Sequence, residues 1–325
     1  MIVSYAELAG ALERALAAIG LDPDRAQRGA RLIADSTRDG VPSHGLNLFP
    51  RVATMIRSGA IDPLARPVRV AAHGALERWD GQRGVGALNA YDAMEAAIAR
   101  ARTSGIACVA LANTNHWMRG GSYGWQAADA GAIAMCWTNT LPNLPPWGAA
   151  APRIGNNPFV AAVPRAKGHV VLDMAMSQFS YGALALYRAR RERLPVAGGF
   201  DRDGRLTDDP AAIEASRRPL PIGFWKGSGL SIVLDIVAAA LAGGRATHEI
   251  ATDPEQETGL SQVFIAIDPA SMAGGEVDRI ADAVIASVQA RYPGERALAA
   301  RNQHLREGIE VDDEVWAFTV RLAGA

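Results

Sequence analysis

Two histidines lie in glycine-rich segments of the kind that form loops. His44 lies in Ser43-His44-Gly45, and His116 lies in a stretch from residue 113 to 157 that is rich in Asn, Gly and Pro. Loops carry many catalytic groups because a rigid scaffold can aim them. Histidine has an ordinary pKa of about 6.5 and can transfer protons near neutral pH. The sequence therefore predicts a proton-transfer site. Other polar residues expected in loops of the same stretch are Asn115, Arg119, Asn139, Asn156 and Asn157.

Two further segments place a charge beside an expected turn. Asp173 follows the apolar run Val170–Leu172, and Lys226 precedes three small residues and a helix expected from Leu230. Glycines let backbone N–H groups approach an anion, and a helix N-terminus favours negative charge. The alternatives are a turn after a strand and a glycine-rich helix start with an exposed lysine. Neither segment has the glycine spacing of a Rossmann dinucleotide fingerprint.

The N-terminal part is predicted to be helical. Ser4 and Glu7 have capping-box spacing, and Asp22-Pro23 begins a second helix that runs to about Thr37, so His44 lies just beyond a helix end. Further helices are expected at Phe49–Ser58, Leu88–Ser104, Leu230–Leu241 and Val277–Arg291.

From about residue 68 onward, short apolar runs alternate with helices. The predicted strands are Val68–Val70, Glu77–Trp79, Ile106–Leu111, Ala132–Trp137, Phe159–Val163, Val170–Leu172 and Gln262–Ile267. Mixed strands and helices behind a helical start indicate a mixed α/β or α+β class.

The composition is that of an ordinary globular enzyme. The 325 residues are 49% hydrophobic and 21% charged, with a formal net charge of −1, so no global field would attract nucleic acid. The basic run from Arg188 to Arg193 is interrupted by Glu192 and is interpreted as a solvated face. Cys108 and Cys136 lie in apolar runs and are predicted to be buried free thiols, and no metal-binding spacing occurs. The chain starts without a signal-peptide pattern, and no apolar run approaches the roughly 20 residues of a membrane span, so a cytoplasmic location is expected.

The motifs of this chain resemble those of the malate/L-lactate dehydrogenase family, whose members lack the Rossmann fold. The motifs are Asp39–Gly45, Asn115-His116-Trp117, Cys136–Asn139, Gly155–Pro158, Leu172–Ala175 and Lys226–Leu230. The resemblance covers nearly the whole chain. It implies a fold with a helical portion, residues 1–68 with roughly 297–325, and a mixed-sheet domain, residues 69–296, that binds cofactor and substrate. It also implies a homodimer that reduces or oxidises 2-keto acids, 2-hydroxy acids or cyclic imino acids with NAD(P)H.

The resemblance also assigns roles to individual residues. His44 corresponds to the family's catalytic histidine, while His116 is a second candidate for the proton donor, and the choice between them stays open. The predicted substrate contacts are Ser43, Leu48, Arg51, Arg119, Asn139 and Thr140. The predicted cofactor contacts are His169, Val170, Val171, Leu172, Asp173, Met174, Ala175, Trp225, Lys226, Gly294, Glu295 and Arg296. The expected cofactor is NADH, with NADPH left open, and no metal is expected.

One position departs from the family pattern. The family usually has arginine three residues after the glycine of Ser-His-Gly, where it is thought to meet the substrate carboxylate, and this chain has Leu48. Leucine cannot make a bidentate carboxylate contact, so either Arg51 or Arg119 replaces the arginine or the substrate differs.

Two other classes of protein remain as alternatives. One is a hydrolase with Ser43 or Ser228 as nucleophile, although no Gly-x-Ser-x-Gly elbow occurs. The other is a non-catalytic binding protein that retains the fold.

Overall fold

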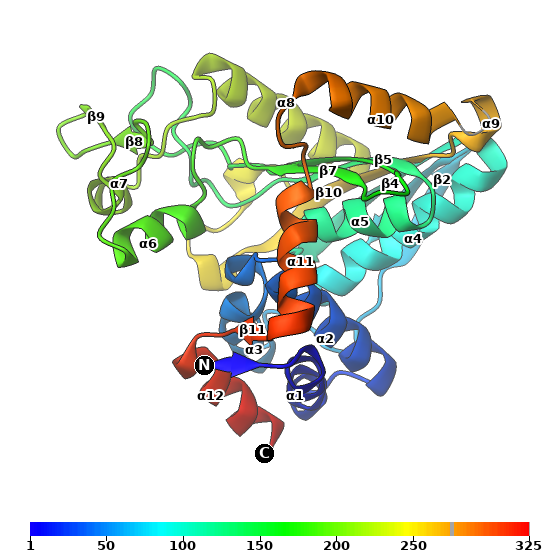
Figure 1. Cartoon of the computed structure of the whole chain (residues 1–325), viewed down its shortest axis with the longest axis horizontal. Helices are drawn as coiled ribbons and strands as arrows, with labels where there is room; N and C mark the ends of the chain where they lie inside the picture. Colours follow the sequence, from blue (N-terminus) through cyan, green and yellow to red (C-terminus); the bar gives the residue numbers. More distant parts are fainter. Residues whose placement is uncertain (274–275, 325) are drawn as a thin grey trace.

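A seven-stranded mixed sheet forms the centre of the protein (Figure 1). The structure is a computed structural model and describes residues 1–273 and 276–324. The strand order is β2-β3-β4-β10-β5-β6-β7, and every neighbouring pair is antiparallel except β3 and β4. The strands are β2 (Val68–His73), β3 (Leu76–Asp80), β4 (Ile106–Asn115), β5 (Ile133–Thr138), β6 (Phe159–Val163), β7 (Val170–Met174) and β10 (Thr258–Ile267).

The two faces of the sheet carry different helices. Along β10, Phe264 packs in a core cluster with residues of α4 (Gly86–Ser104) and α5 (Gly121–Asp129). Its neighbour Val263 packs with Leu234 and Ala238 of α8 (Trp225–Ala242) on the opposite face. Successive side chains of a strand point to opposite faces, so β10 is buried on both sides. This explains its nearly continuous apolar sequence.

The N-terminal helices form a separate apolar cluster with the C-terminal end of the chain. The helices α1 (Tyr5–Ala18), α2 (Pro23–Arg38) and α3 (Phe49–Arg57) share this core with α12 (Asp313–Ala323). The capping box of Ser4 and Glu7 is present as predicted. Strands β1 (Ile2–Val3) and β11 (Ile309–Glu310) pair to bring the two ends of the chain together, as Figure 1 shows. The cluster also takes Val85, Ala87, Leu88 and Met118, so it continues past residue 68.

Smaller elements surround one end of the sheet. Two short helices, α6 (Tyr181–Ala189) and α7 (Pro210–Ser216), pack together beside the hairpin of β8 (Gly199–Phe200) and β9 (Leu206–Thr207). The chain then returns through α9 (Ala270–Ala273), α10 (Glu276–Val288) and α11 (Glu295–Glu307). In the part of the chain that the structure describes, 3-10 turns also occur at Pro42–His44, Leu46–Leu48, Thr247–Glu249 and Pro254–Gln256.

Helix α8 differs from its prediction in two respects. It covers Trp225–Ala242, so Lys226 lies in its first turn and not before it. The buried Gly227 allows this earlier start, because a Cβ there would lie 2.5 Å from the Ile222 carbonyl oxygen. Within the described residues, α8 is also the one helix long and apolar enough to cross a membrane by length and composition. Glycines and Asp235 divide its apolar residues into short runs, so it contains no continuous apolar stretch of that length.

Three other sequence expectations need correction. Strand β4 extends to Asn115, so this residue ends a strand and does not lie in a loop. Gly121 to Asp129 form α5 inside the segment expected to be mainly loop. Cys136 is a buried free thiol as predicted, but Cys108 is only half-buried, and burial raises the pKa of the Cys108 thiol to about 11.

Candidate active site

His44 is the last residue of a 3-10 turn that follows α2. Its Nδ1 lies 3.1 Å from the Ser43 hydroxyl oxygen. Partial burial lowers the pKa of the His44 ring, and the positive charge of Arg119 lowers it further, while the carboxylate of Asp173 acts in the opposite direction. His44 is therefore a half-buried imidazole with a carboxylate near it that favours its protonated form.

His116 follows directly after β4 and is held in one tautomer. The backbone N–H of Met118 donates to His116 Nδ1 at 3.1 Å. Because Nδ1 accepts this bond, the ring proton of the neutral imidazole resides on Nε2. Burial is the main cause that lowers the pKa of His116 to about 4. At neutral pH this ring is uncharged and presents a single N–H donor.

The two histidine rings stack at the junction of the helical portion and the sheet. Their centroids lie 6.1 Å apart with an angle of 23° between the ring planes. The positive charge of either ring lowers the tendency of the other to protonate. The structure thus brings together the two histidines that are 72 positions apart in the sequence (116 − 44).

Asp173 connects the histidines to the edge strand β7. Its Oδ2 accepts a hydrogen bond from the Gly121 backbone N–H at 2.8 Å, at the N-terminus of α5. A Cβ on Gly121 would lie 2.8 Å from the same oxygen, so only glycine allows this approach. The positive end of the α5 dipole thus faces the Asp173 carboxylate.

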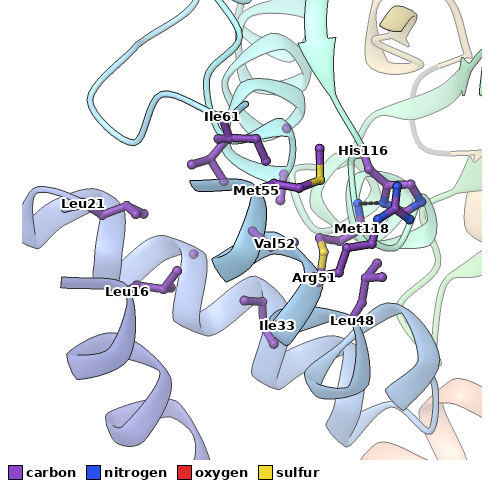
Figure 2. Close-up of a pocket in the computed structure, with 14 residues that line it drawn as sticks. Leu16, Leu21, Ile33, Leu48, Arg51, Val52, Met55, Ile61, His116 and Met118 are labelled. Carbon is purple, nitrogen blue, oxygen red and sulfur yellow. Dashed lines mark hydrogen bonds between the residues drawn. The ribbon is translucent and has the colours of Figure 1, made fainter. Parts of the chain in front are cut away.

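Arg51 and Leu48 lie on the helical side of His116. The Arg51 guanidinium forms a 2.8 Å ion pair with Glu257, whose other oxygen accepts from the Leu141 N–H at 2.9 Å. The side chains of Leu48, Arg51 and His116 line a cavity of about 20 Å³. Figure 2 shows Leu48, Arg51 and Met118 beside His116, with apolar side chains of the helical core behind them. The space next to His116 is therefore almost wholly apolar.

Asn139 and Thr140 lie at the end of β5 and are buried. The Asn139 amide donates to the Asp235 carboxylate at 2.9 Å and to the Arg245 carbonyl at 2.8 Å, and its oxygen accepts from the Ser261 N–H. The Thr140 hydroxyl donates to the amide oxygen of Asn156 at 3.1 Å, within the loop that faces β5. Both polar side chains are thus used inside the scaffold that carries the histidines.

Arg119 binds Asp39, the residue that follows α2, and its charge also acts on His44. Its side chain is buried and forms a 2.9 Å ion pair with Asp39. Ser43, by contrast, faces α6, because a Cβ on Gly182 would lie 2.9 Å from the Ser43 Cβ. Of the predicted substrate contacts, Ser43, Leu48 and Arg51 lie beside the histidines, while Asn139, Thr140 and Arg119 bind other protein groups.

The three segments assigned to the cofactor meet at β7, the edge strand of the sheet. At the start of β7, the Val171 N–H donates to the Pro293 carbonyl at 2.9 Å, which brings Gly294 against the strand. Beyond the end of β7, the Ile222 N–H donates to the Met176 carbonyl at 2.8 Å. This hydrogen bond brings the start of α8 close to the strand. The predicted contacts in these segments are His169, Val170, Val171, Leu172, Asp173, Met174, Ala175, Trp225, Lys226, Gly294, Glu295 and Arg296.

Two features of this edge suit a dinucleotide. Asp173, Trp225 and Lys226 are exposed, so their side chains are accessible to a ligand. Glu295 has a buried carboxylate oxygen, Oε2, without a hydrogen-bond partner in the described part of the chain. A buried polar atom normally has a partner, and a carboxylate is the group that binds ribose hydroxyls in many dinucleotide sites.

Glu257 was not anticipated from the sequence. It is buried and holds both Arg51 and the backbone after Thr140, and its charge acts on His116. In the sequence it belongs to the acidic stretch Asp253–Glu257, which has the pattern of an exposed turn. No local signal could have separated this buried carboxylate from its solvated neighbours.

Comparison with known proteins gives a consistent result over the whole chain. A family model described as malate/L-lactate dehydrogenase matches residues 3–318. The chain belongs to this family. It is 46% identical to 2,3-diketo-L-gulonate reductase of Shigella boydii, with 98% of both chains covered. The crystal structure of delta1-piperideine-2-carboxylate reductase from Pseudomonas syringae matches with a TM-score of 0.89 at 30% identity, over 99% of both chains. Sulfolactate dehydrogenase from Methanocaldococcus jannaschii matches with a TM-score of 0.91 at 26% identity, over 100% of this chain and 97% of the other.

Family membership confirms the predicted reaction class and fold. As a malate/L-lactate dehydrogenase family member, the protein is an oxidoreductase that acts on CH–OH groups. The family's mixed-sheet fold is the one seen here. Membership of this oxidoreductase family therefore replaces both alternatives, a hydrolase and a non-catalytic binding protein.

Proposed function

We propose that the protein is an NADH-dependent reductase of a small 2-keto acid, with 2,3-diketo-L-gulonate as the preferred substrate and 3-keto-L-gulonate as the product. The observation that carries this proposal is that the three predicted cofactor segments meet at the edge strand β7, which also carries Asp173, the carboxylate whose charge acts on His44. The substrate assignment is supported by 46% identity to a 2,3-diketo-L-gulonate reductase over the whole chain.

In this proposal His44 donates the proton. Reduction of a ketone leaves negative charge on oxygen, so the protein must supply a proton and a hydrogen-bond donor to that atom. His44 suits the first task because Asp173 favours its charged form. His116 suits the second task, since its ring is neutral and carries hydrogen on Nε2.

The cofactor supplies the hydride when bound. The backbone of His169–Ala175 along β7, the start of α8 at Trp225 and Lys226, and Gly294–Arg296 would hold it. The unpartnered carboxylate oxygen of Glu295 suits a ribose with free hydroxyls better than a phosphorylated one. This charge is the reason to prefer NADH to NADPH.

The apolar surroundings of Leu48 favour a second candidate within the same reaction class. Position 48 carries no arginine, and the guanidinium that lines the cavity beside His116, that of Arg51, already pairs with Glu257. A 2-hydroxy acid such as lactate, malate, sulfolactate or ureidoglycolate, or a cyclic imino acid, would then be the substrate. The proposed roles of Asn139, Thr140 and Arg119 are to hold the loops in place.

One experiment tests cofactor and substrate together. Tryptophan emission of the purified protein is titrated with NADH and then NADPH, and nicotinamide absorbance is followed after addition of 2,3-diketo-L-gulonate or a panel of 2-keto acids. We expect quenching by NADH and loss of absorbance with 2,3-diketo-L-gulonate. Turnover with another acid alone would move the assignment to the second candidate, and absence of binding by either nucleotide would contradict the proposal.

We further propose that the protein acts as a cytoplasmic homodimer. Helix α8 packs one side on the sheet and leaves Ile232, Val233 and Ile236 exposed. Contiguous exposed apolar side chains mark interaction surfaces in many proteins. We propose that α8 contributes to the dimer, and that residues 1–68 with 297–325 and residues 69–296 are the two structural units of each protomer. Light scattering of the protein and of Ile236→Glu tests this: a dimer that dissociates in the variant supports it, and a monomeric parent protein contradicts it.

A further inference from the structure

Three guanidinium groups from separate parts of the chain bind a single buried carboxylate. Asp39, directly after α2, is 3% exposed. Its Oδ2 accepts from Arg119 at 2.9 Å and from Arg301 at 2.7 Å. Its Oδ1 accepts from a second nitrogen of Arg301 at 2.9 Å and from its neighbour Arg38 at 2.9 Å. We call Asp39, Arg38, Arg119 and Arg301 the Asp39 cluster.

The Asp39 cluster lies where apolar packing between the two parts of the protein is interrupted. A cavity of about 730 Å³ lies among α2, α4, α5 and α11, and all four residues of the cluster line it. Its other lining residues include Asp35, Glu95, Arg102 and Gln126. The charged cluster connects the end of α2 with Arg119 before α5 and with α11 beside this space.

Arg301 links the cluster to the proposed cofactor site. It lies on α11, the helix that begins at Glu295, immediately after the turn that binds the start of β7. Its guanidinium stacks on Trp125, with 4.3 Å to the ring centroid, and Trp125 in turn lies 5.5 Å from the ring of His169. A second contact, from the His304 ring to the Arg38 carbonyl, joins α11 to the end of α2.

Two members of the cluster lie close in the sequence to the two histidines. Asp39 lies five residues before His44, on the segment that ends α2. Arg119 lies three residues after His116, in a turn where Met118 has a left-handed backbone with φ of +64°. A shift of α11 would therefore be transmitted to both histidine segments through two ion pairs on one carboxylate.

We propose that Asp39 is a positioning residue whose carboxylate ties helix α11 of the cofactor site to the two segments that carry His44 and His116. The inference rests on the proposed reductase function for its catalytic consequence. It goes beyond that function in coupling cofactor binding to the placement of both histidines. Asp39 itself touches neither substrate nor cofactor in this proposal.

The charge balance of the cluster provides a specific readout. The charged and titratable groups that act on His44 are Asp173 from β7, Arg119 from the turn after β4, and the stacked ring of His116. Asp39 neutralises part of the Arg119 charge. Replacing Asp39 with Asn would leave the positive charge of Arg119 without this partner, and the pKa of His44 should fall. An additional Arg119→Met substitution would remove that positive charge and raise the pKa of His44 again.

The experiment compares D39N, D39N/R119M and the matched control D35N in the full-length protein. Asp35 lies one turn earlier on α2, lines the same cavity and binds Arg38 and the Tyr5 hydroxyl, and within the described residues no hydrogen bond or ion pair joins its carboxylate to Arg119 or Arg301. The measurements are NADH affinity by tryptophan quenching, turnover as a function of pH, and NMR titration of the His44 ring in the cofactor-free protein. The chain has six histidines, so assignment by single substitutions is practical.

We expect D39N to weaken NADH binding about three- to tenfold and to lower turnover about tenfold, with the His44 titration moved to lower pH. D39N/R119M should return the titration toward its original position, and D35N should change none of these.

Equal behaviour of D39N and D35N, or an unmoved His44 titration in D39N, would overturn the inference. If D39N does not fold, R301K and R301M replace it: the lysine variant should retain more NADH affinity than the methionine variant, and equal affinities of these two variants would overturn the coupling. The titration needs no turnover, so failure of the reductase proposal would be recognised separately, by the parent protein's lack of NADH binding.

Discussion

The segments around His44 and His116 place the same residue type in two different electrostatic settings. The Asp173 carboxylate raises the pKa of His44 against the effect of burial, whereas burial lowers the pKa of His116 to about 4. The rings stack 6.1 Å apart. The difference between their settings is the basis on which we propose proton donation for His44 and orientation for His116.

This difference shows that groups outside the two rings control their protonation. The Asp173 carboxylate of β7 raises the pKa of His44, and the backbone N–H of Met118 fixes the tautomer of His116. Both of these groups come from elements far from His44 in the sequence. The predictions below remove these contributions one at a time, beginning with the largest expected effect.

Loss of the His44 ring should have the greatest consequence. We expect His44→Ala to lower turnover by roughly 10²–10⁴, the usual contribution of a general acid, while NADH affinity stays close to that of the parent protein. Steady-state turnover and fluorescence titration measure the two quantities. The matched control is His73→Ala on the exposed strand β2, which should leave both unchanged; normal turnover of His44→Ala would remove His44 from the mechanism.

Removal of the Asp173 charge should make the two histidines more alike. In the reducing direction His44 must be protonated, so turnover declines as pH rises through its pKa. Asp173 raises that pKa, and Asp173→Asn should therefore lower turnover at neutral pH by about 10–100-fold and move the decline to lower pH. The amide oxygen can still accept from Gly121, which preserves the start of α5.

The pH profile of kcat measures this shift, with Asp203→Asn, at an exposed carboxylate of a surface hairpin, as the control. A decline at the same pH in Asp173→Asn and the parent protein would show that Asp173 does not set the protonation of His44.

Much of the fold could be predicted from sequence, because local patterns specify it. The capping box of Ser4 and Glu7 and the period of the apolar strands depend on neighbours in the chain. The family motifs also brought together His44, His116 and the segments along β7. By contrast, the ion pair of Arg51 with Glu257 joins residues 206 positions apart. No local pattern distinguishes such a carboxylate from a solvated one.

The same reasoning explains why polar loop residues were predicted less well than the histidines. Asn139 and Arg119 have the types and the loop setting of substrate contacts, yet their partners are Asp235 and Asp39. Whether a polar side chain faces a ligand or a distant part of the chain depends on tertiary packing. A sequence motif indicates that the residue type is needed at a position, but it does not predict the direction in which the side chain points.

Substitution of His116 should affect stability as well as turnover. Because burial lowers its pKa to about 4, the folded protein binds this proton less readily than the unfolded chain, whose histidine has a pKa of about 6.5. The stabilising contribution is full above pH 6.5 and is lost as pH falls toward 4, by up to roughly 3 kcal/mol. His116→Gln should remove this part of the pH dependence and lower turnover about tenfold.

Urea unfolding at pH 7 and pH 5 measures the first effect. His116→Gln should narrow the difference between the two pH values, whereas His73→Gln should not. An unchanged difference in His116→Gln would mean that the ring titrates normally in the folded protein, and the contrast with His44 would then be lost.

The smallest expected effect concerns the apolar surface beside His116. Leu48 lies three residues before Arg51, and both line the same cavity, so an arginine at position 48 would place a second guanidinium on that side of the ring. Leu48→Arg should raise the ratio of kcat/KM for dicarboxylic over monocarboxylic 2-keto acids about three- to tenfold, because guanidinium binds carboxylate in a bidentate manner.

Competition assays with paired substrates measure this ratio, and Leu48→Met is the control for changed packing. If Leu48→Arg changes the ratio no more than Leu48→Met does, position 48 does not face the substrate. Selectivity must then come from other groups, of which the Arg51–Glu257 pair beside His116 is the first to test.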